Sequence, residues 1–99
     1  MFESVKAVAI SIKPKKWDKI YNADKLERLF EEAARQNPQL MLAPEGVLEG
    51  YVVMDVIEGR RTAEEMLDIA ESIDGPYIAR FQRLARALKI CLCFGFAER

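Results

Sequence analysis

The chain has 99 residues, enough for one small domain, and 51% hydrophobic with 31% charged residues is typical of globular rather than disordered sequences. Its 15 basic and 16 acidic residues leave a formal net charge of -1, which gives no electrostatic reason to expect nucleic acid or an anionic membrane as partner. No apolar run approaches the roughly 20 residues that span a bilayer, and the N-terminus lacks the signals of a secretory leader, so we expect a cytoplasmic protein.

The first half of the chain predicts a strand, a helix and a second strand. Residues 5–12 are mostly apolar or β-branched and predict the first strand. Asn22 is expected to cap the helix, and Asn37-Pro38 to end it, because the residue before proline resists the α region. Residues 40–43 are apolar and too few for a helix, so they predict the second strand. The stripe that the helix buries comprises Leu26, Leu29, Phe30, Ala33 and Ala34.

The second half predicts two helices and a third strand. Residues 51–57 have strand propensity, but glycines flank them. Such glycines equally suit a long excursion of the chain away from the sheet. Thr62 and Glu65 have the spacing of a capping box, which opens a helix. Gly75-Pro76 starts another helix, and residues 90–97 alternate large and small apolar side chains as in a strand.

These elements predict an α/β fold, namely a βαβ-ααβ segment with a three-stranded, mainly parallel sheet. Both faces of 5–12 and 90–97 are apolar, as in a parallel sheet covered on both sides. The predicted helices cover only one side, which leaves an apolar patch on the order of several hundred Å². A partner chain or more of the same chain is expected to cover it. The sequence stops soon after a strand without a closing helix, so we expect 1–99 to be a single partial domain.

Cys91 and Cys93 lie two apart in an apolar run and would share one face of a strand. That spacing disfavours a mutual disulfide, and a chain without histidine offers few further ligands for a metal. We therefore expect two buried thiols and no metal. Glu49 and Glu58 are expected to face water, and Trp17 to be a packing or interface residue.

Glu45 is the single acid that follows the 40–43 strand. A strand-end glutamate is most simply a solvated surface residue. Parallel α/β sheets, however, place function at the carboxyl ends of their strands, and a carboxylate beside Pro44 and Leu42 would be partly desolvated, as suits a general base. From the residues alone, both interpretations of Glu45 remain open.

Four segments, together with the Asn22 helix that follows the first of them, resemble the beginning of the carbon–nitrogen hydrolases, the superfamily of nitrilases, amidases and carbamoylases. They are "VKAVAISIKP", "LMLAPEGVLEGY", "GPYIARFQRLARALKI" and "CLCFGFAER". The most specific element is Pro44-Glu45 followed by Gly50-Tyr51. The resemblance implies an αββα sandwich that hydrolyses a non-peptide C–N bond with a glutamate, a lysine and a cysteine, without metal or organic cofactor.

The resemblance also implies roles for individual residues. Glu45 matches the glutamate, which acts as general base while the cysteine attacks a nitrile or amide and the lysine stabilises the oxyanion. Tyr51 could line the substrate pocket or simply pack. The family's lysine and cysteine lie beyond the last residue of this sequence, and Cys91 and Cys93 do not match the nucleophile. The chain is therefore expected to be an N-terminal fragment that is inactive by itself.

A second interpretation stays open beside the hydrolase. The same segment could be a standalone α/β interaction module that hides its bare sheet face by homodimerising. The hydrolase interpretation implies a small-molecule amide or nitrile as substrate of the full-length protein. Both interpretations predict a homo-oligomer, and neither predicts a nucleic-acid or membrane partner.

Overall fold

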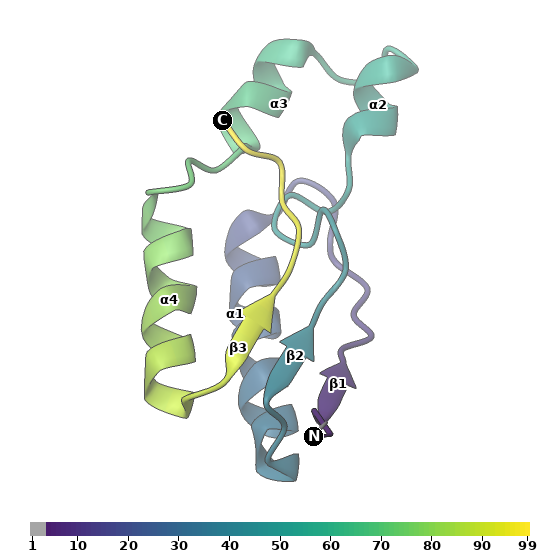
Figure 1. The fold of residues 1–99 in the computed structure, drawn as a ribbon. Helices are drawn as coiled ribbons and strands as arrows, with labels where there is room; N and C mark the ends of the chain where they lie inside the picture. The colour runs from purple at the N-terminus through teal and green to yellow at the C-terminus, as the bar shows by residue number, and fades with distance from the viewer. Residues whose placement is uncertain (1–3) are drawn as a thin grey trace.

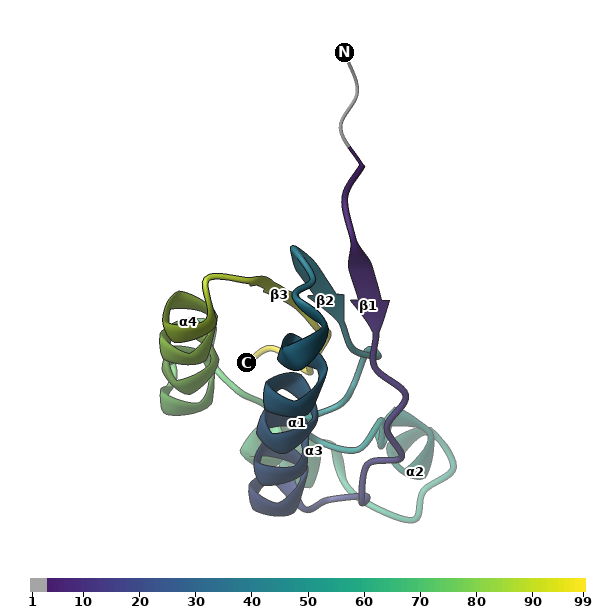
Figure 2. The same ribbon diagram turned by 90° about the horizontal axis from the view of Figure 1, so that it is seen from below.

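The computed structural model describes residues 4–99 as a two-layer α/β arrangement (Figure 1). In chain order the elements are β1 (Ala7–Ala9), α1 (Lys19–Ala33), the 3-10 turn η1 (Ala34–Gln36), β2 (Leu40–Leu42), α2 (Val53–Ile57), α3 (Ala63–Ile69), α4 (Pro76–Leu88) and β3 (Cys91–Cys93). The strands form a parallel three-stranded sheet in the order β1-β2-β3, which confirms the predicted fold class. Figure 1 shows α2 and α3 beyond the carboxyl ends of the strands, and Figure 2 shows α1 and α4 on one side of the sheet.

Helix α1 begins earlier than predicted. Asp18 is its N-cap, and its Oδ1 accepts a 3.0 Å hydrogen bond from the amide of Tyr21. Aspartate caps a helix as well as asparagine does, so the helix gains a turn before Asn22. Asn22 is instead fully buried, and its Nδ2 donates to the carbonyls of Lys15 and Leu48, each at 2.8 Å. The predicted end of the helical region is confirmed, since Asn37 caps η1 with a left-handed φ of 55°.

The segment with ambiguous propensity leaves the sheet and contains the short helix α2, so of the two interpretations left open for 51–57 the excursion agrees with the structure and the strand does not. Gly46 and Gly50 adopt φ values of 65° and 90°, which only glycine adopts without strain, and they turn the chain away from the sheet. The two helix starts with strong local signals are confirmed. Thr62 and Glu65 form a capping box on α3, and Pro76 occupies the first turn of α4.

The core lies between the sheet and the two long helices. Phe30 of α1, Phe81 of α4 and Phe94 after β3 meet there, with ring centroids 6.1 Å apart for Phe30–Phe81 and 5.0 Å apart for Phe81–Phe94. The buried cluster consists of Ala23, Leu26, Phe30, Ala33, Met41, Val47, Leu48, Ile78 and Phe81. It includes Val47 and Leu48, so the turn that follows β2 is packed into the core.

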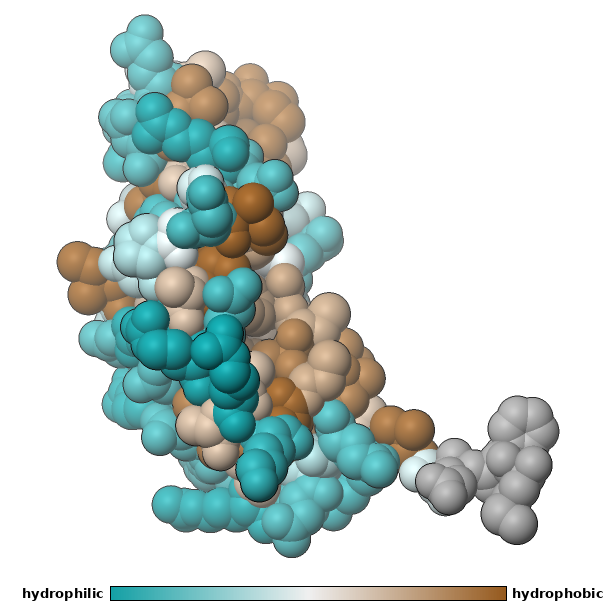
Figure 3. All heavy atoms as spheres, turned by 60° about the vertical axis from the view of Figure 1, so that its left-hand side comes forward, coloured by the Kyte–Doolittle hydropathy of each residue, from teal (hydrophilic) through white to brown (hydrophobic). Residues whose placement is uncertain are grey.

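The opposite face of the sheet is bare among the described residues, as the sequence predicts. Ala7, Ala9, Cys91 and Cys93 are exposed, and Leu42 at the end of β2 is 38% exposed. Hydrophobic colour gathers in Figure 3 at the right of the lower half. No helix in the described range 4–99 is both long and apolar enough to cross a bilayer.

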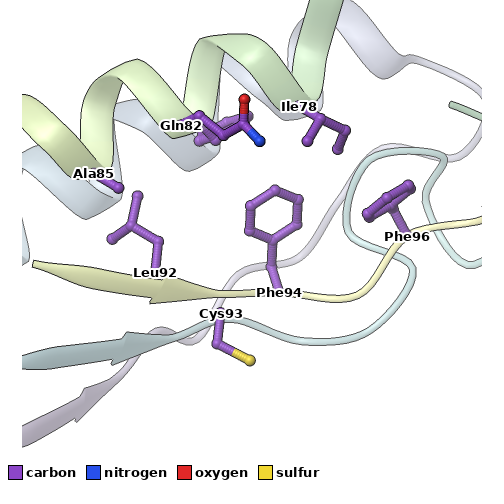
Figure 4. A pocket seen from close by; sticks show the side chains of 8 residues that line it. Ile78, Gln82, Ala85, Leu92, Cys93, Phe94 and Phe96 are labelled. Atoms are coloured by element: carbon purple, nitrogen blue, oxygen red, sulfur yellow. The ribbon is translucent and has the colours of Figure 1, made fainter. Parts of the chain in front are cut away.

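The predicted burial of both thiols is wrong for the described chain, because Cys91 and Cys93 are exposed on that bare face. Successive side chains of a strand point to opposite faces of the sheet. The residues next to those that contact the helices therefore lie on the uncovered face. Figure 4 shows Cys93 pointing away from α4, whereas Leu92 and Phe94 point toward it.

Candidate functional site

Glu45 lies in the turn that follows β2, the middle strand of the sheet. Its backbone contacts Gly95, which follows β3. A Cβ on Gly95 would stand 2.7 Å from Cα and 2.9 Å from Cβ of Glu45, so only glycine fits there without displacing the turn. The amide of Gly95 also donates to the carbonyl of Pro44 at 3.3 Å. The predicted placement of Glu45 at a strand end therefore agrees with the structure.

The expected partial desolvation of Glu45 is not found. Glu45 and Pro44 are both exposed, and Leu42 beside them is only partly covered. No described element covers the bare face of the sheet near the turn, and the Glu45 carboxylate is open to water. Among residues 4–99, no hydrogen bond or ion pair joins the Glu45 carboxylate to another residue.

Tyr51 lies beside the turn that carries Glu45. The amides of Gly50 and Tyr51 both donate to the carbonyl of Gly46 at 2.9 Å. A Cβ on Gly46 would stand 2.7 Å from Cδ2 of Tyr51, so the tyrosine ring lies against the residue that follows Glu45. Tyr51 is 52% exposed and has a left-handed φ of 55°, a strained conformation for a bulky side chain. The fold thus brings the two candidate site residues into one turn.

Glu49 is buried, so its predicted exposure to water is wrong. It is 5% exposed, and its Oε1 accepts a 2.9 Å hydrogen bond from the amide of Ala97. Its neighbour Leu48 is also buried, at 1% exposed, but no local sequence signal indicates the burial of Glu49 itself. Glu58 is exposed, as predicted.

A second buried carboxylate, Asp55 of α2, joins α2 to the loop that follows β1. It is 7% exposed and accepts hydrogen bonds from Nη2 of Arg60 at 2.8 Å and Nε1 of Trp17 at 2.9 Å, with Nζ of Lys16 at 3.3 Å. The Arg60 guanidinium first, and then the Trp17 indole, hold the pKa of Asp55 well below its ordinary value. The guanidinium of Arg61 lies 4.2 Å from the centroid of Trp17, which agrees with the packing interpretation of Trp17, while the interface interpretation stays a prediction.

Other features of the described chain do not meet at Glu45. A hollow of about 300 Å³ lies between α4 and the last strand (Figure 4), and neither Glu45 nor Tyr51 lines it. Its lining consists of Ile78, Phe81, Gln82, Ala85, Leu92, Cys93, Phe94 and Phe96. Within residues 4–99, no group of three or more His, Cys, Asp or Glu side chains is placed to hold a metal ion. The chemistry that the Glu45 turn offers is that of an accessible carboxylate that can accept a proton.

Comparison with known proteins agrees with this arrangement. The profile of the carbon–nitrogen hydrolase family matches residues 6–99. A bifunctional nitrilase/nitrile hydratase of Nicotiana tabacum is 32% identical over 105 residues, and one of Lupinus angustifolius is 31% identical over the same length. Each alignment covers 97% of this chain and 30% of the relative, so the chain spans about a third of the length of these relatives. The chain belongs to the carbon–nitrogen hydrolase family.

Proposed function

We propose that this chain supplies the general base for hydrolysis of a nitrile or an amide, and that Glu45 is that base. The observation that carries the proposal is an exposed carboxylate at the carboxyl end of the middle parallel strand, within the Pro44-Glu45 and Gly50-Tyr51 pattern. Functional groups of open α/β sheets gather at this edge. Membership of the family supports the reaction class, and the names of the two relatives support a nitrile among the substrates.

The proposed reaction needs a cysteine thiol and a lysine from outside this chain. Glu45 takes the thiol proton as sulfur attacks the nitrile or amide carbon, while the lysine stabilises the charge that develops on the former nitrile nitrogen or amide oxygen. With an amide, Glu45 passes the thiol proton to the departing nitrogen, so the amine or ammonia leaves and the thioester forms. With a nitrile, Glu45 passes that proton to the nitrogen of a thioimidate, and one water then converts the thioimidate to the thioester with release of ammonia. In both cases the Glu45 carboxylate, ionised again, takes a proton from the water that attacks the thioester and returns it to the departing sulfur, which frees the carboxylic acid and the thiol.

Position supports Tyr51 as a lining residue for the substrate. Its half-exposed ring lies against Gly46, directly after Glu45, so the ring lies beside the turn at which a substrate would meet Glu45. A Tyr51→Phe variant removes only the hydroxyl, and a Tyr51→Ala variant removes the ring. If the ring lines the pocket, we expect alanine to raise KM much more than phenylalanine does.

The first test asks whether catalysis requires more than these residues. We expect the 99-residue chain alone to release no ammonia from a panel of nitriles and amides, because a hydrolase without its nucleophile loses most of its rate enhancement. The coding DNA after residue 99 should continue in frame with a lysine and then a cysteine at a strand-to-helix turn. A stop codon there, or turnover by the chain alone that survives Glu45→Gln, would overturn the proposal.

The second test measures Glu45 in a turnover-competent protein that contains this chain. General bases typically contribute about 10²- to 10⁴-fold to the rate, so Glu45→Gln should lower kcat by at least about 100-fold. Glu58→Gln is the matched control, because Glu58 is an exposed glutamate on another segment. Equal kcat values of the two variants would show that Glu45 is not the general base.

The bare sheet face supports a second candidate, a module that homodimerises through this face. It presents the uncharged residues Ala7, Ala9, Leu42, Cys91 and Cys93, so two copies would meet without repulsion between like charges. Light scattering should then show a dimer that Leu42→Lys dissociates and Ile20→Lys, at an exposed apolar position on α1, leaves intact. The thiols should react slowly in the dimer and quickly in the Leu42→Lys variant. A well-folded monomer at high concentration would rule this candidate out.

A further inference from the structure

Glu49 is a buried carboxylate that the proposed reaction does not use. It is 5% exposed, and a charge placed away from water needs hydrogen bonds to offset its lost hydration. Its side chain does not form an ion pair with any lysine or arginine in the described part of the chain. Something other than charge pairing must therefore account for the presence of a glutamate at this position.

The carboxylate connects two segments that are far apart in the sequence. Oε1 of Glu49 accepts the amide of Ala97 at 2.9 Å, and Ala97 lies in the extended segment that follows β3. The backbone carbonyl of Glu49 accepts the amide of Trp17 at 3.0 Å, in the loop between β1 and α1. Glu49 thus fastens the turn after β2 to the segments that follow both neighbouring strands.

The same carboxylate lies beside the backbone of the Glu45 turn. Oε2 of Glu49 is 3.0 Å from the position that a Cβ on Gly46 would occupy, so the carboxylate packs against the residue directly after Glu45. Two backbone bonds reinforce this contact. The amide of Val47 donates to the carbonyl of Gly95 at 3.1 Å, and the amide of Gly95 donates to the carbonyl of Pro44 at 3.3 Å.

Glycines make this turn flexible unless other contacts hold it. Gly46 and Gly50 flank the turn, both with positive φ, and glycine retains more backbone freedom than other residues. A catalytic base must be held within a fraction of an ångström of its productive position. The two backbone bonds to Gly95 fix only the start of the turn, whereas the Glu49 side chain reaches across from its far end.

We propose that Glu49 is a positioning residue, which holds Glu45 in place by clamping the turn after β2 onto the Ala97 segment. The inference rests on the proposed role of Glu45 as general base. What the clamp needs at position 49 is an acceptor oxygen at the end of a side chain as long as that of glutamate. The negative charge itself is not required, since the partner is a neutral backbone amide.

The clamp can be measured on the 99-residue chain without any enzyme assay. Glu49→Ala should accelerate hydrogen exchange of the Ala97 amide by at least about tenfold and shift the amide resonances of Glu45 and Gly46. Glu49→Gln keeps the side-chain length and the acceptor oxygen, so its Ala97 exchange rate and its Glu45 and Gly46 resonances should be those of the wild type. Glu58→Ala, at an exposed glutamate, should match the wild type. If alanine unfolds the chain, Glu49→Asp replaces it, because its carboxylate is one methylene too short to reach Ala97.

In a turnover-competent protein that contains this chain, Glu49→Ala should lower kcat by at least about tenfold with little change in KM, and Glu49→Gln should recover most of the loss. Unchanged exchange at Ala97 in Glu49→Ala, or equal effects of alanine and glutamine, would overturn the positioning role. Faster exchange together with full activity of Glu45→Gln would instead overturn the proposed function and leave the clamp as a purely structural contact. The two failures are therefore distinguishable.

Discussion

Nζ of Lys19 lies 3.1 Å from Oε1 of Glu71, and the two side chains are only 14% and 8% exposed. Oε2 of Glu71 also accepts the amide of Tyr77 at 2.7 Å, and Nζ of Lys19 also donates to the carbonyl of Ala70 at 3.3 Å. The start of α1, the end of α3 and the start of α4 therefore meet at one buried ion pair. This pair orients the helices that precede and follow the Glu45 turn in the chain.

Removal of one partner of this pair should strongly destabilise the fold. Lys19→Met leaves the Glu71 carboxylate buried without its counter-ion, and such changes cost about 3 kcal/mol or more in free energy of unfolding. Urea unfolding followed by circular dichroism measures the loss. Lys15→Met is the control, because its pair with Asp18 is 66% and 37% exposed and should contribute less than about 1 kcal/mol. Equal losses for the two variants would show that the buried pair is no more important than a surface pair.

Asp55 gives the fold a defined dependence on pH. The bonds from Arg60 and Trp17 lower the pKa of Asp55 from its ordinary value of 3.8 in the folded state. The stabilisation is therefore fully present above the unfolded-state pKa and is lost as pH falls below it, when the unfolded chain takes up a proton that the folded chain resists. The urea concentration at the midpoint of unfolding should be lower for Asp55→Asn than for the wild type. The difference between the two midpoints should be constant from pH 7 to pH 5, and this margin should shrink below about pH 4.

The fluorescence of Trp17 monitors that prediction directly, because it is the one tryptophan of the chain and its indole donates to Asp55. The spectrum of Asp55→Asn should differ from that of the wild type even under conditions in which both are folded. Asp68→Asn changes an exposed aspartate of α3 and serves as control. A margin that stays constant down to pH 2 would contradict the assignment of the pH dependence to Asp55.

Elements with strong local signals could be predicted from the sequence. The Thr62 capping box, the Gly75-Pro76 helix start and the Asn37-Pro38 helix end each depend on residues within one turn. The strand propensity of 51–57 was overridden, because Asp55 finds its partners in the loop after β1 and the flanking glycines redirect the chain.

The candidate site could be predicted only in part. A βαβ unit places the end of its second strand at the functional edge of the sheet, and this fixes the position of Glu45 without knowledge of any contact. Its exposure, and that of Cys91 and Cys93, depends on which elements cover the second face of the sheet. The burial of Glu49 depends on Ala97, which is 48 positions away. Local patterns carry no information on such contacts.

The capping box of α3 should make a measurable contribution by itself. Oγ1 of Thr62 accepts the amide of Glu65 at 3.1 Å, and Oε1 of Glu65 accepts the amide of Thr62 at 3.0 Å. Thr62→Ala removes the acceptor from the first turn and should lower the free energy of unfolding by about 1 kcal/mol. Thr62→Ser keeps the hydroxyl and should stay within about 0.5 kcal/mol of the wild type. An alanine variant as stable as the serine variant would show that α3 does not depend on its cap.

The close approach of Gly95 to Glu45 makes glycine necessary at this position. In Gly95→Ala the new methyl group would stand 2.7 Å from Cα of Glu45, and because backbone cannot rotate away as a side chain can, the turn itself must move. We expect a loss of about 1–3 kcal/mol in free energy of unfolding and shifted amide resonances at Glu45 and Val47. In a turnover-competent protein the same displacement should lower kcat.

Gly59→Ala separates this steric effect from ordinary glycine strain. Gly59 has a φ of 77° and nothing within 4 Å of its missing Cβ, so alanine there is unfavourable only through its backbone conformation. That cost is about 1–2 kcal/mol and should leave the Glu45 resonances unchanged. Because both variants lower stability, stability alone cannot separate them, whereas the resonances of the turn can. Unshifted Glu45 and Val47 resonances in Gly95→Ala would mean that the β3 segment yields instead, and that the Glu45 turn is the more rigid of the two.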